Sequence, residues 1–185
     1  MLIFNIVWAV WLLSEVLLTV IVRSGRSDKK GHDKGTLAII WIVIFIAMFS
    51  GIFISNNWRS VLGNSNLLLY AGLFIILIGM MIRFYAIWSL GRLFTVNVTI
   101  RESHTVKKDG IYRMVRHPSY SGSLLSFVGF GISLNNWISL LTITIPVAAA
   151  FIYRIKIEEH LLIAQFGEDY LDYKKKTYYL IPWIY

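Results

Sequence analysis

The chain alternates between long apolar stretches and short polar, mostly basic segments. Five apolar stretches stand out: Leu2–Val22, Thr36–Ser55, Leu67–Leu90, Tyr120–Leu134 and Trp137–Tyr153. A bilayer core of about 30 Å needs about 20 helical residues, so the first three are long enough to span it. The last two are shorter and are separated by two asparagines only. The pattern predicts an all-α integral membrane protein with about five transmembrane helices, ending in a C-terminal helical hairpin and an amphipathic tail.

The lysines and arginines between these stretches indicate an orientation. The segments that follow the five stretches carry, in order, 5, 1, 6, 0 and 5 of them. Cytoplasmic loops are enriched in Lys and Arg, so five spans with the N-terminus outside place every strongly basic segment in the cytoplasm. Arg83, inside the third stretch, is expected either to reach that same side or to face the bundle interior. We take the plasma membrane as the default location.

Composition supports the membrane interpretation. Hydrophobic residues make up 57% of the 185 residues, and the formal net charge is +8. The basic residues lie between apolar stretches, where topology explains them, so no nucleic-acid partner is expected. There is no cysteine, which excludes disulfides, thiolate metal sites and cysteine nucleophiles. The first stretch lacks a basic leader and a small-residue cleavage site, so we expect a retained helix.

Most polar chemistry falls in the second half of the chain. We expect a single domain in which residues 1–90 form three N-terminal transmembrane helices, and residues 91–185 carry the polar loop, the hairpin and the tail. Scattered histidines without ligand spacing give no metal site. Glu15, within the first stretch, is either a functional carboxylate or the partner of a residue on another helix.

The first polar feature precedes the hairpin. Pro118 disfavours a helical conformation for His117 and is well placed to open the fourth helix. Arg116 and His117 then lie just before a helix N-terminus, where free backbone N–H groups attract anions. The alternative is a basic cluster beside the membrane that binds lipid headgroups.

The second and third features follow the fifth stretch. Arg154 and Glu158 are four residues apart and therefore share a helix face, either as an ordinary ion pair or as a pair with a function. An amphipathic helix then ends near Gly167, and a second short helix follows on the membrane surface. The lysine run Lys174–Lys176 is interpreted as a surface anchor.

These features together resemble the isoprenylcysteine carboxyl methyltransferase family. The resemblance rests on the order and spacing of His104–Tyr112, Arg116–Tyr120, Arg154 with Glu158-Glu159, and Phe166–Tyr170, and it covers roughly residues 90–182. It implies S-adenosylmethionine as methyl donor, bound in a pocket on the cytoplasmic side and outside any Rossmann domain. The segment after residue 90 thereby becomes the cofactor-binding loop.

The resemblance also assigns residues. Arg154 matches the family's substrate-side arginine and is the expected catalytic residue. The expected cofactor-binding residues are Asn97, His104, Thr105, Val106, Lys107, Tyr112, His117, Pro118, Ser119, Tyr120 and Glu158. Where the family has Leu-Val, this chain has Val106-Lys107, so a charge replaces an apolar wall residue.

The residue chemistry fits methyl transfer to an amphiphilic or lipidic acceptor. Glu158 is suited to hold the cofactor's ammonium, and the basic loop its carboxylate. A carboxylate acceptor is already ionised near pH 7 and needs no strong base, whereas a phenolic acceptor needs one, and His117 is then the candidate. Two alternatives remain at this stage: a membrane sterol-type reductase with a similar Arg-His-Pro pattern, and a non-catalytic lipid-binding or scaffold protein.

Overall fold

The computed structural model describes residues 2–21, 29–30, 35–91, 99–100 and 105–182. Nearly all of this part of the chain is helical, as the apolar pattern predicts. Its elements, in chain order, are α1 (Leu2–Ile21), β1 (Lys29–Lys30), α2 (Thr36–Asn57), α3 (Ser65–Leu90), β2 (Thr99–Ile100), the 3₁₀ turn η2 (Gly110–Arg113), α4 (Pro118–Ser133), α5 (Trp137–Phe166) and α6 (Glu168–Lys175).

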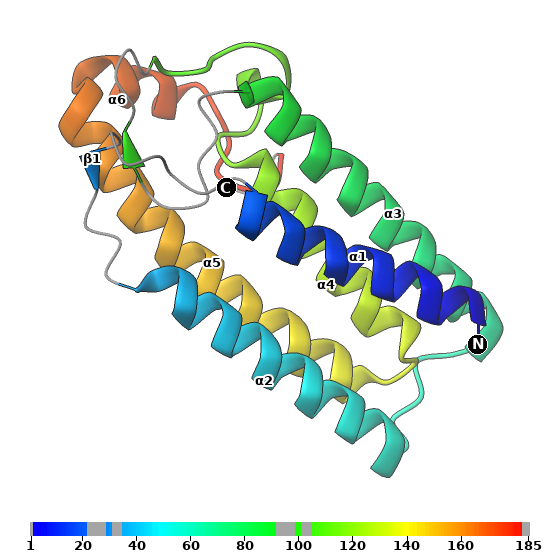
Figure 1. Cartoon of the computed structure of the whole chain (residues 1–185). Coiled ribbons are helices and arrows are strands. Elements are labelled where there is room, and N and C mark those ends of the chain that lie inside the picture. The colour runs from blue at the N-terminus through cyan, green and yellow to red at the C-terminus, as the bar shows by residue number, and fades with distance from the viewer. Residues whose placement is uncertain (1, 22–28, 31–34, 92–98, 101–104, 183–185) are drawn as a thin grey trace.

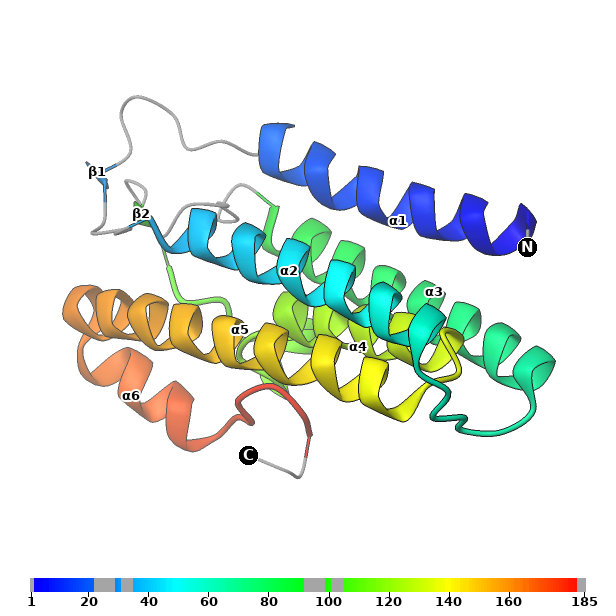
Figure 2. The same cartoon turned by 90° about the horizontal axis from the view of Figure 1, so that it is seen from below.

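The long helices form a bundle whose axes run along one common direction (Figures 1 and 2). Within it α3 packs on α4, α2 packs on α5, and α4 contacts α5. The strands β1 and β2 and the helix α6 lie at one end, and the α2–α3 loop and the α4–α5 turn lie at the other, together with the N-terminus. The basic segments that bear β1, β2 and α6 therefore share one end of the bundle.

Strands β1 and β2 form a short antiparallel pair that pure helix counting did not predict. Lys29 pairs with Ile100, and Lys30 pairs with Thr99. The pair joins the segment after α1 to the segment after α3. The all-α prediction therefore holds for the bundle, and the strand pair β1–β2 is an addition outside it.

The close packing of α3 on α4 has a cause in the sequence. Gly72 and Gly79 of α3 face Gly129 and Gly122 of α4, and a Cβ added at Gly72 or Gly79 would lie 2.5 Å from the facing carbonyl oxygen. Only glycine allows two helix backbones to approach this closely, as in many membrane helix pairs. The spacing of two helical turns between the two contacts holds α4 along the length of α3.

The far end of the bundle is fastened by the turn between α4 and α5. Asn135 has a φ of 50°, and its Oδ1 accepts hydrogen bonds from the backbone N–H groups of Leu62 and Gly63, both at 3.1 Å. Asn136 donates from Nδ2 to the Trp58 carbonyl at 2.6 Å, while its Oδ1 caps α5 at Ser139. The two asparagines thus attach the α4–α5 turn to the α2–α3 loop by hydrogen bonds.

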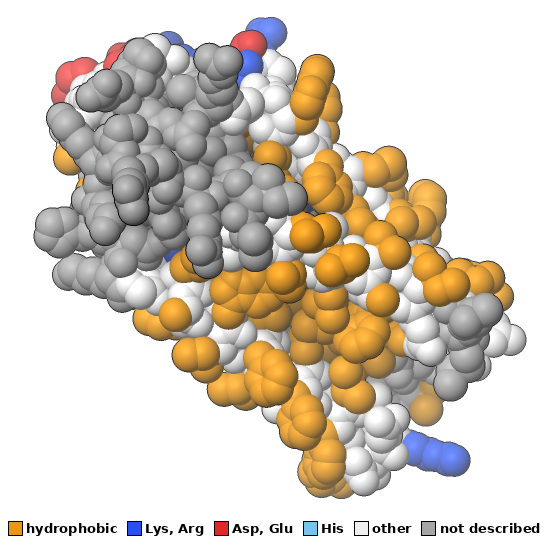
Figure 3. Space-filling model, in the orientation of Figure 1, with side chains coloured by type: hydrophobic (Ala, Val, Ile, Leu, Met, Phe, Trp, Pro, Cys, Tyr) orange, Lys and Arg blue, Asp and Glu red, His pale blue; other side chains and the backbone are white. Residues whose placement is uncertain are grey.

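Three described helices are long and apolar enough to cross a membrane: α2, α3 and α5. A shorter apolar stretch, Ile3–Thr19, belongs to α1. Large apolar side chains such as Phe45, Phe49 and Phe74 point outward, and orange apolar atoms cover much of the bundle's surface in Figure 3. This surface suits a lipid solvent rather than water.

The apolar stretch that ends at Tyr153 and the amphipathic helix predicted to end near Gly167 belong to one helix. Helix α5 continues past Arg154 to Phe166, through Pro146, and ends where Gly167 adopts a φ of 52°. The helix accommodates the charge of Arg154 because its side chain is buried and hydrogen-bonded. The predicted end at Gly167 and the short following helix, α6, are both confirmed.

Candidate active site

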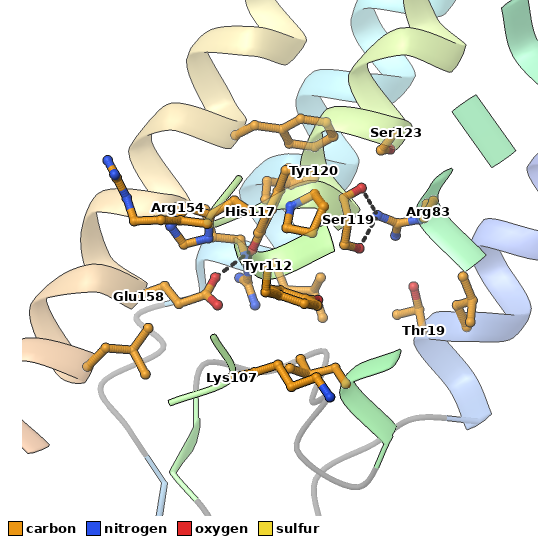
Figure 4. A pocket seen from close by; sticks show the side chains of 18 of the residues that line it. Thr19, Arg83, Lys107, Tyr112, His117, Ser119, Tyr120, Ser123, Arg154 and Glu158 are labelled. Carbon is orange, nitrogen blue, oxygen red and sulfur yellow. Dashed lines mark hydrogen bonds between the residues drawn. The ribbon is translucent and has the colours of Figure 1, made fainter. Parts of the chain in front are cut away.

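The centre of the candidate site is a relay of three side chains from α4 and α5. Arg154, only 3% exposed, donates from Nε to the Tyr120 hydroxyl at 3.2 Å and from Nη1 to Thr36 Oγ1 of α2 at 2.5 Å. The Tyr120 hydroxyl in turn donates to Glu158 Oε2 at 3.1 Å. Arg154 and Glu158 therefore share a helix face, as predicted, and Tyr120 connects them (Figure 4).

The start of α4 positions Tyr120. Pro118 stands in the first turn of α4, and His117 before it has a φ of -124° and a ψ of 56°, outside the helical region as Pro118 predicts. The carbonyl of His117 accepts hydrogen bonds from the backbone N–H groups of Tyr120 and Ser121, both at 3.1 Å. This first turn directs the Tyr120 ring toward α5, where it packs edge-on against Phe151.

The two adjacent glutamates of α5 have different surroundings. Glu159 is 4% exposed, and its carboxylate contacts Arg116 Nε at 2.9 Å, Lys174 Nζ at 2.6 Å and His117 Nε2 at 3.3 Å. Glu158 receives the single hydrogen bond from Tyr120 among the described contacts and lines the cavity. Glu159 therefore neutralises the basic cluster, and Glu158 retains acceptor capacity toward the cavity.

Arg116 fastens the C-terminal segment to the site. Its Nη1 donates to the Lys174 carbonyl at 2.9 Å and to the Thr177 carbonyl, and its backbone N–H donates to the Tyr178 carbonyl at 2.9 Å. Because the guanidinium is already engaged by Glu159 and by this segment, Arg116 is not free to bind an anion, contrary to our expectation for the basic loop. The lysine run is correspondingly more than a surface anchor, since Lys174 takes part in the same network.

Tyrosine rings form one wall of the cavity. Tyr112, Tyr170 and Tyr173 are buried and line it together with Tyr120. The Tyr112 hydroxyl donates to the Ala86 carbonyl at 3.2 Å, and the Tyr173 hydroxyl donates to the Tyr112 carbonyl at 2.6 Å. Burial raises the pKa of Tyr112, Tyr170 and Tyr173 above the ordinary tyrosine value, so these hydroxyls stay neutral donors.

The segment before η2 closes the cavity at the polar end. Thr105, Val106 and Lys107 all line it. Lys107 pairs with Asp109, with Nζ 3.0 Å from Oδ1, and this hydrogen bond holds the pKa of Asp109 below its usual value. The charge that departs from the family pattern thus stands at the cavity's rim.

All predicted site residues that the structure describes meet in this one cavity. They are Thr105, Val106, Lys107, Tyr112, His117, Pro118, Ser119, Tyr120, Arg154 and Glu158. Asn97 and His104 lie outside the described residues. Segments separated by about fifty residues in the chain therefore converge as the resemblance implied.

The opposite part of the cavity is apolar and belongs to the bundle interior. It is lined by side chains of α1, α2, α4 and α5, namely Leu12, Leu18, Leu37, Ile40, Trp41, Ile44, Phe127 and Phe151. The cavity therefore has two parts. We call the part among Lys107, Tyr112 and Glu158 the polar chamber, and the part among these apolar side chains, at the level of the candidate spans, the apolar chamber.

Sequence reasoning assigned no site role to an ion pair that also lines the cavity. Arg83 of α3 and Glu15 of α1 lie with Nη2 and Oε2 2.7 Å apart, and Arg83 donates from Nη1 to the Ser119 carbonyl at 3.1 Å. Of the alternatives left open, Arg83 faces the bundle interior, and Glu15 pairs with another helix. Opposite charges in two apolar stretches were the available signal.

Comparison with known proteins places this fold in a family. The sequence model described as phospholipid methyltransferase matches residues 67–169, more than half of the chain. A protein-S-isoprenylcysteine O-methyltransferase from Arabidopsis thaliana is 38% identical over 115 residues, which are 61% of this chain and 58% of the relative. Its counterpart from Xenopus laevis is 37% identical over 115 residues, 61% of this chain and 40% of the relative.

A solved structure agrees with the sequence relatives. The eukaryotic intramembrane Ras methyltransferase ICMT, isoprenylcysteine carboxyl methyltransferase, superposes with a TM-score of 0.67 at 26% identity, covering 98% of this chain and 65% of the other. This chain thus spans between 40% and 65% of these relatives' lengths. The resemblance seen in the sequence is confirmed, and the chain is an integral membrane protein that belongs to the isoprenylcysteine carboxyl methyltransferase family, matched by the phospholipid methyltransferase model.

Proposed function

We propose that this protein transfers a methyl group from S-adenosylmethionine to the carboxylate of a lipidic acceptor of the S-isoprenylcysteine kind. The observation that carries the proposal is the Arg154–Tyr120–Glu158 relay, which stands where a polar chamber meets an apolar one. The names of the relatives support this acceptor class.

The polar chamber fits the proposed cofactor. Glu158 offers a carboxylate with spare acceptor capacity to an ammonium group, and the faces of Tyr112, Tyr170 and Tyr173 suit a sulfonium, because aromatic faces attract cations. Thr105, Val106, Lys107 and the His117–Tyr120 turn supply the remaining wall, with Asn97 and His104 proposed from the family pattern. When bound, the cofactor supplies an electrophilic methyl group.

The apolar chamber fits the tail of the acceptor. Leu12 and Leu18 of α1 and Ile40 and Trp41 of α2 line it, so we place the acceptor's entrance from the bilayer between these two helices. An ionised carboxylate needs no general base near pH 7, and the chain's task is to orient it. Arg154, held by Thr36 and Tyr120, is the guanidinium proposed to do this. His117 is held against Glu159 and is not needed as a base in this scheme.

Exclusion of water at this junction favours the reaction. Methyl transfer from a sulfonium to a carboxylate neutralises two charges. Water would stabilise the charged reactants more than the transition state, so a site that excludes water favours the reaction. Phe127 and Phe151, which are 2% and 4% exposed, close the junction on the bundle side. The acceptor's own apolar tail would complete the closure.

The proposed topology is five spans with the N-terminus outside and the site at the cytoplasmic face of the plasma membrane. The alternation of basic segments supports this arrangement, as does their gathering at the end of the bundle that holds the site. The chain has no native cysteine, so single-cysteine variants at Asn66 and at Lys175 test it with an impermeant maleimide on intact cells. Labelling of the Lys175 variant and protection of the Asn66 variant would reverse the orientation.

Calorimetric binding of S-adenosylhomocysteine to the protein in detergent tests the cofactor site. Glu158→Ala should weaken binding by about thirtyfold or more, since truncating one partner of a charged hydrogen-bonded pair costs about 2–5 kcal/mol. Glu168→Ala, at an exposed glutamate of α6, is the matched control and should bind like wild type. Binding by neither folded wild type nor control would favour a non-catalytic lipid-binding protein, and unchanged binding by Glu158→Ala would refute its assignment.

A further inference from the structure

A second guanidinium lies in the cavity, away from the Arg154 relay. Arg83 of α3 is bound on one side by Glu15 of α1, and on the other by the carbonyl and the Oγ of Ser119, at 3.1 and 3.2 Å. In Figure 4 it lies on the opposite side of Ser119 and Tyr120 from Arg154 and Glu158. The Ser119 contacts fix Arg83 against the first turn of α4, directly beside the proposed chemistry.

Arg83 has a binding edge that Glu15 fills only in part. Its Nη2 lies 2.7 Å from Glu15 Oε2, whereas its Nε is buried with no hydrogen-bond partner among the described residues. The Nε and Nη2 groups of a guanidinium form the edge that binds a carboxylate with two parallel hydrogen bonds. A buried donor left unpaired carries a free-energy cost. The site is therefore better suited to a carboxylate that binds this edge with both oxygens.

We propose that Arg83 is the docking point for the acceptor's carboxylate as it arrives from the bilayer, and that Glu15 holds this place in the free protein and competes with the acceptor for it. The inference rests on the proposed function, because it takes the same acceptor class. The exchange is one of ion-pair partners and involves no covalent step.

The surroundings of the pair support this role. Leu12 and Leu18 flank Glu15 on α1 and line the apolar chamber, so an acceptor whose tail lies there brings its carboxylate close to Arg83. One guanidinium balances one carboxylate at a time in an apolar site, since a second charge without a partner is costly there. An uncharged analogue has nothing to exchange for Glu15. The pair therefore selects anionic acceptors over neutral ones of the same shape.

Helix α1 keeps its place when Glu15 releases Arg83. Trp11 is fully buried and packs edge-on against Phe127, with ring centroids 4.9 Å apart, and Trp8 stacks on Phe130 at 6.0 Å. These contacts do not involve the ion pair. Substitution of Glu15 therefore alters the charge beside Arg83 without removing the apolar attachment of α1.

The experiment compares an S-farnesylcysteine carrying an N-acetyl group with its C-terminal amide, which has the same shape and no charge. Binding of each is measured in uncharged detergent to wild type, Glu15→Gln, Glu15→Asp and the control Ser14→Ala, whose side chain bonds only to its own helix backbone at Trp11 in the described contacts. S-Adenosylhomocysteine affinity and thermal unfolding are recorded for all four proteins.

We expect Glu15→Gln to bind the acid about tenfold more tightly, which corresponds to about 1.4 kcal/mol, and to show a lower KM with little change in kcat. Its affinity for the amide should not change. Glu15→Asp keeps the competing charge and should resemble wild type, as should Ser14→Ala. A merely structural ion pair would instead lower thermal stability and shift acid and amide affinities alike.

Three results would overturn the inference. The first is weaker acid binding by Glu15→Gln, and the second is an equal change for acid and amide. The third is displacement of the bound acid by phosphatidylglycerol but no effect of Glu15→Gln, because the anion at Arg83 would then be a lipid headgroup. The first two results would overturn the inference alone. If S-adenosylhomocysteine binds but neither farnesyl ligand binds any variant, the acceptor class of the proposed function fails together with the inference, and only the cofactor assignment stands. If S-adenosylhomocysteine does not bind either, the proposed function itself fails.

Discussion

Helices α4 and α1 both contact α3, but they are held to it by different means. Helix α4 meets α3 backbone to backbone at glycines, where an added Cβ at Gly79 would stand 2.5 Å from the Gly122 carbonyl oxygen. Helix α1 is attached to α3 through the Glu15–Arg83 ion pair, and to α4 through the rings of Trp8 and Trp11, which pack on Phe130 and Phe127. The first contact leaves no freedom, and the second consists of contacts that can be exchanged one at a time.

This difference divides the cavity into a fixed wall and an adjustable one. The residues of the polar chamber come from α4, α5 and the segments docked on them, whereas α1 contributes to the apolar chamber. Catalytic geometry needs the fixed wall, because small displacements of reacting groups slow a reaction strongly. A lipidic acceptor needs a wall that can admit a long chain. Variants at the α3–α4 contact, in α1 and at the cavity rim can test whether α1 and α4 differ in this way.

The largest expected effect comes from filling the backbone contact. Gly79→Leu should abolish the folded protein, because the side chain can be accommodated only if α3 and α4 separate, and overpacking of even one or two methylenes costs about 1–3 kcal/mol. Size-exclusion chromatography and circular dichroism in detergent measure it. Gly63→Leu is the control, since Gly63 is exposed and an added Cβ meets only Leu68, at 3.6 Å. A folded, active Gly79→Leu variant would contradict the proposed rigidity of this wall.

An intermediate effect is expected from loosening α1. Trp11→Ala should lower the free energy of unfolding by about 3 kcal/mol, the usual scale for removing a large buried aromatic side chain. The protein should still bind S-adenosylhomocysteine, because none of the proposed cofactor-binding residues is on α1. Thermal unfolding and calorimetry on the same preparation measure both quantities. Loss of cofactor binding in a protein that remains folded would mean that α1 is as much a part of the fixed wall as α4.

The smallest effect is expected at the rim, outside both helices. Asp109 pairs with Lys107 at the surface, and the pKa of Asp109 is lowered by that hydrogen bond. A lowered pKa favours the folded state above the carboxyl's unfolded value, and the benefit is lost as the pH falls through the folded value. Because Asp109 is exposed, Asp109→Asn should leave the unfolding temperature at pH 7 almost unchanged. A drop like that of Trp11→Ala would show that the rim helps to hold the fold.

Much of the helix plan could be predicted because it follows from short-range rules. Pro118 opens α4, Gly167 closes α5, and the apolar stretches match α1, α2 and α3 within about two residues at each end. The family pattern likewise predicted that Tyr112, Tyr120 and Glu158 lie close together. Short-range sequence rules could not have predicted this. The resemblance supplied spacing, and the structure supplied the Tyr120 hydroxyl that joins Arg154 to Glu158.

The rest depended on contacts between distant segments. The sequence shows two adjacent glutamates. Only the packing of α6 and Arg116 around Glu159 reveals that Glu159 is the one held in ion pairs inside the protein. The pairing of Glu15 with Arg83 requires knowledge that α1 lies beside α3 at matching depth. The glycines of α3 and α4 look unremarkable singly, and their meaning lies in which glycine faces which.

Helix α5 also relates the site to the thickness of the membrane. Trp137 begins it half-exposed, as interfacial tryptophans are, and Arg154 and Glu158 follow on the same continuous helix. At 1.5 Å per residue Arg154 lies about 26 Å from Trp137 and Glu158 about 32 Å, either side of the roughly 30 Å of a bilayer's hydrocarbon core. In the proposed topology, this spacing would place the proposed acceptor-orienting guanidinium at the depth of the hydrocarbon core and the proposed cofactor-facing carboxylate just beyond it. A thinner bilayer would hydrate Arg154 and a thicker one would submerge Glu158, so turnover should peak at one acyl-chain length of the host lipid.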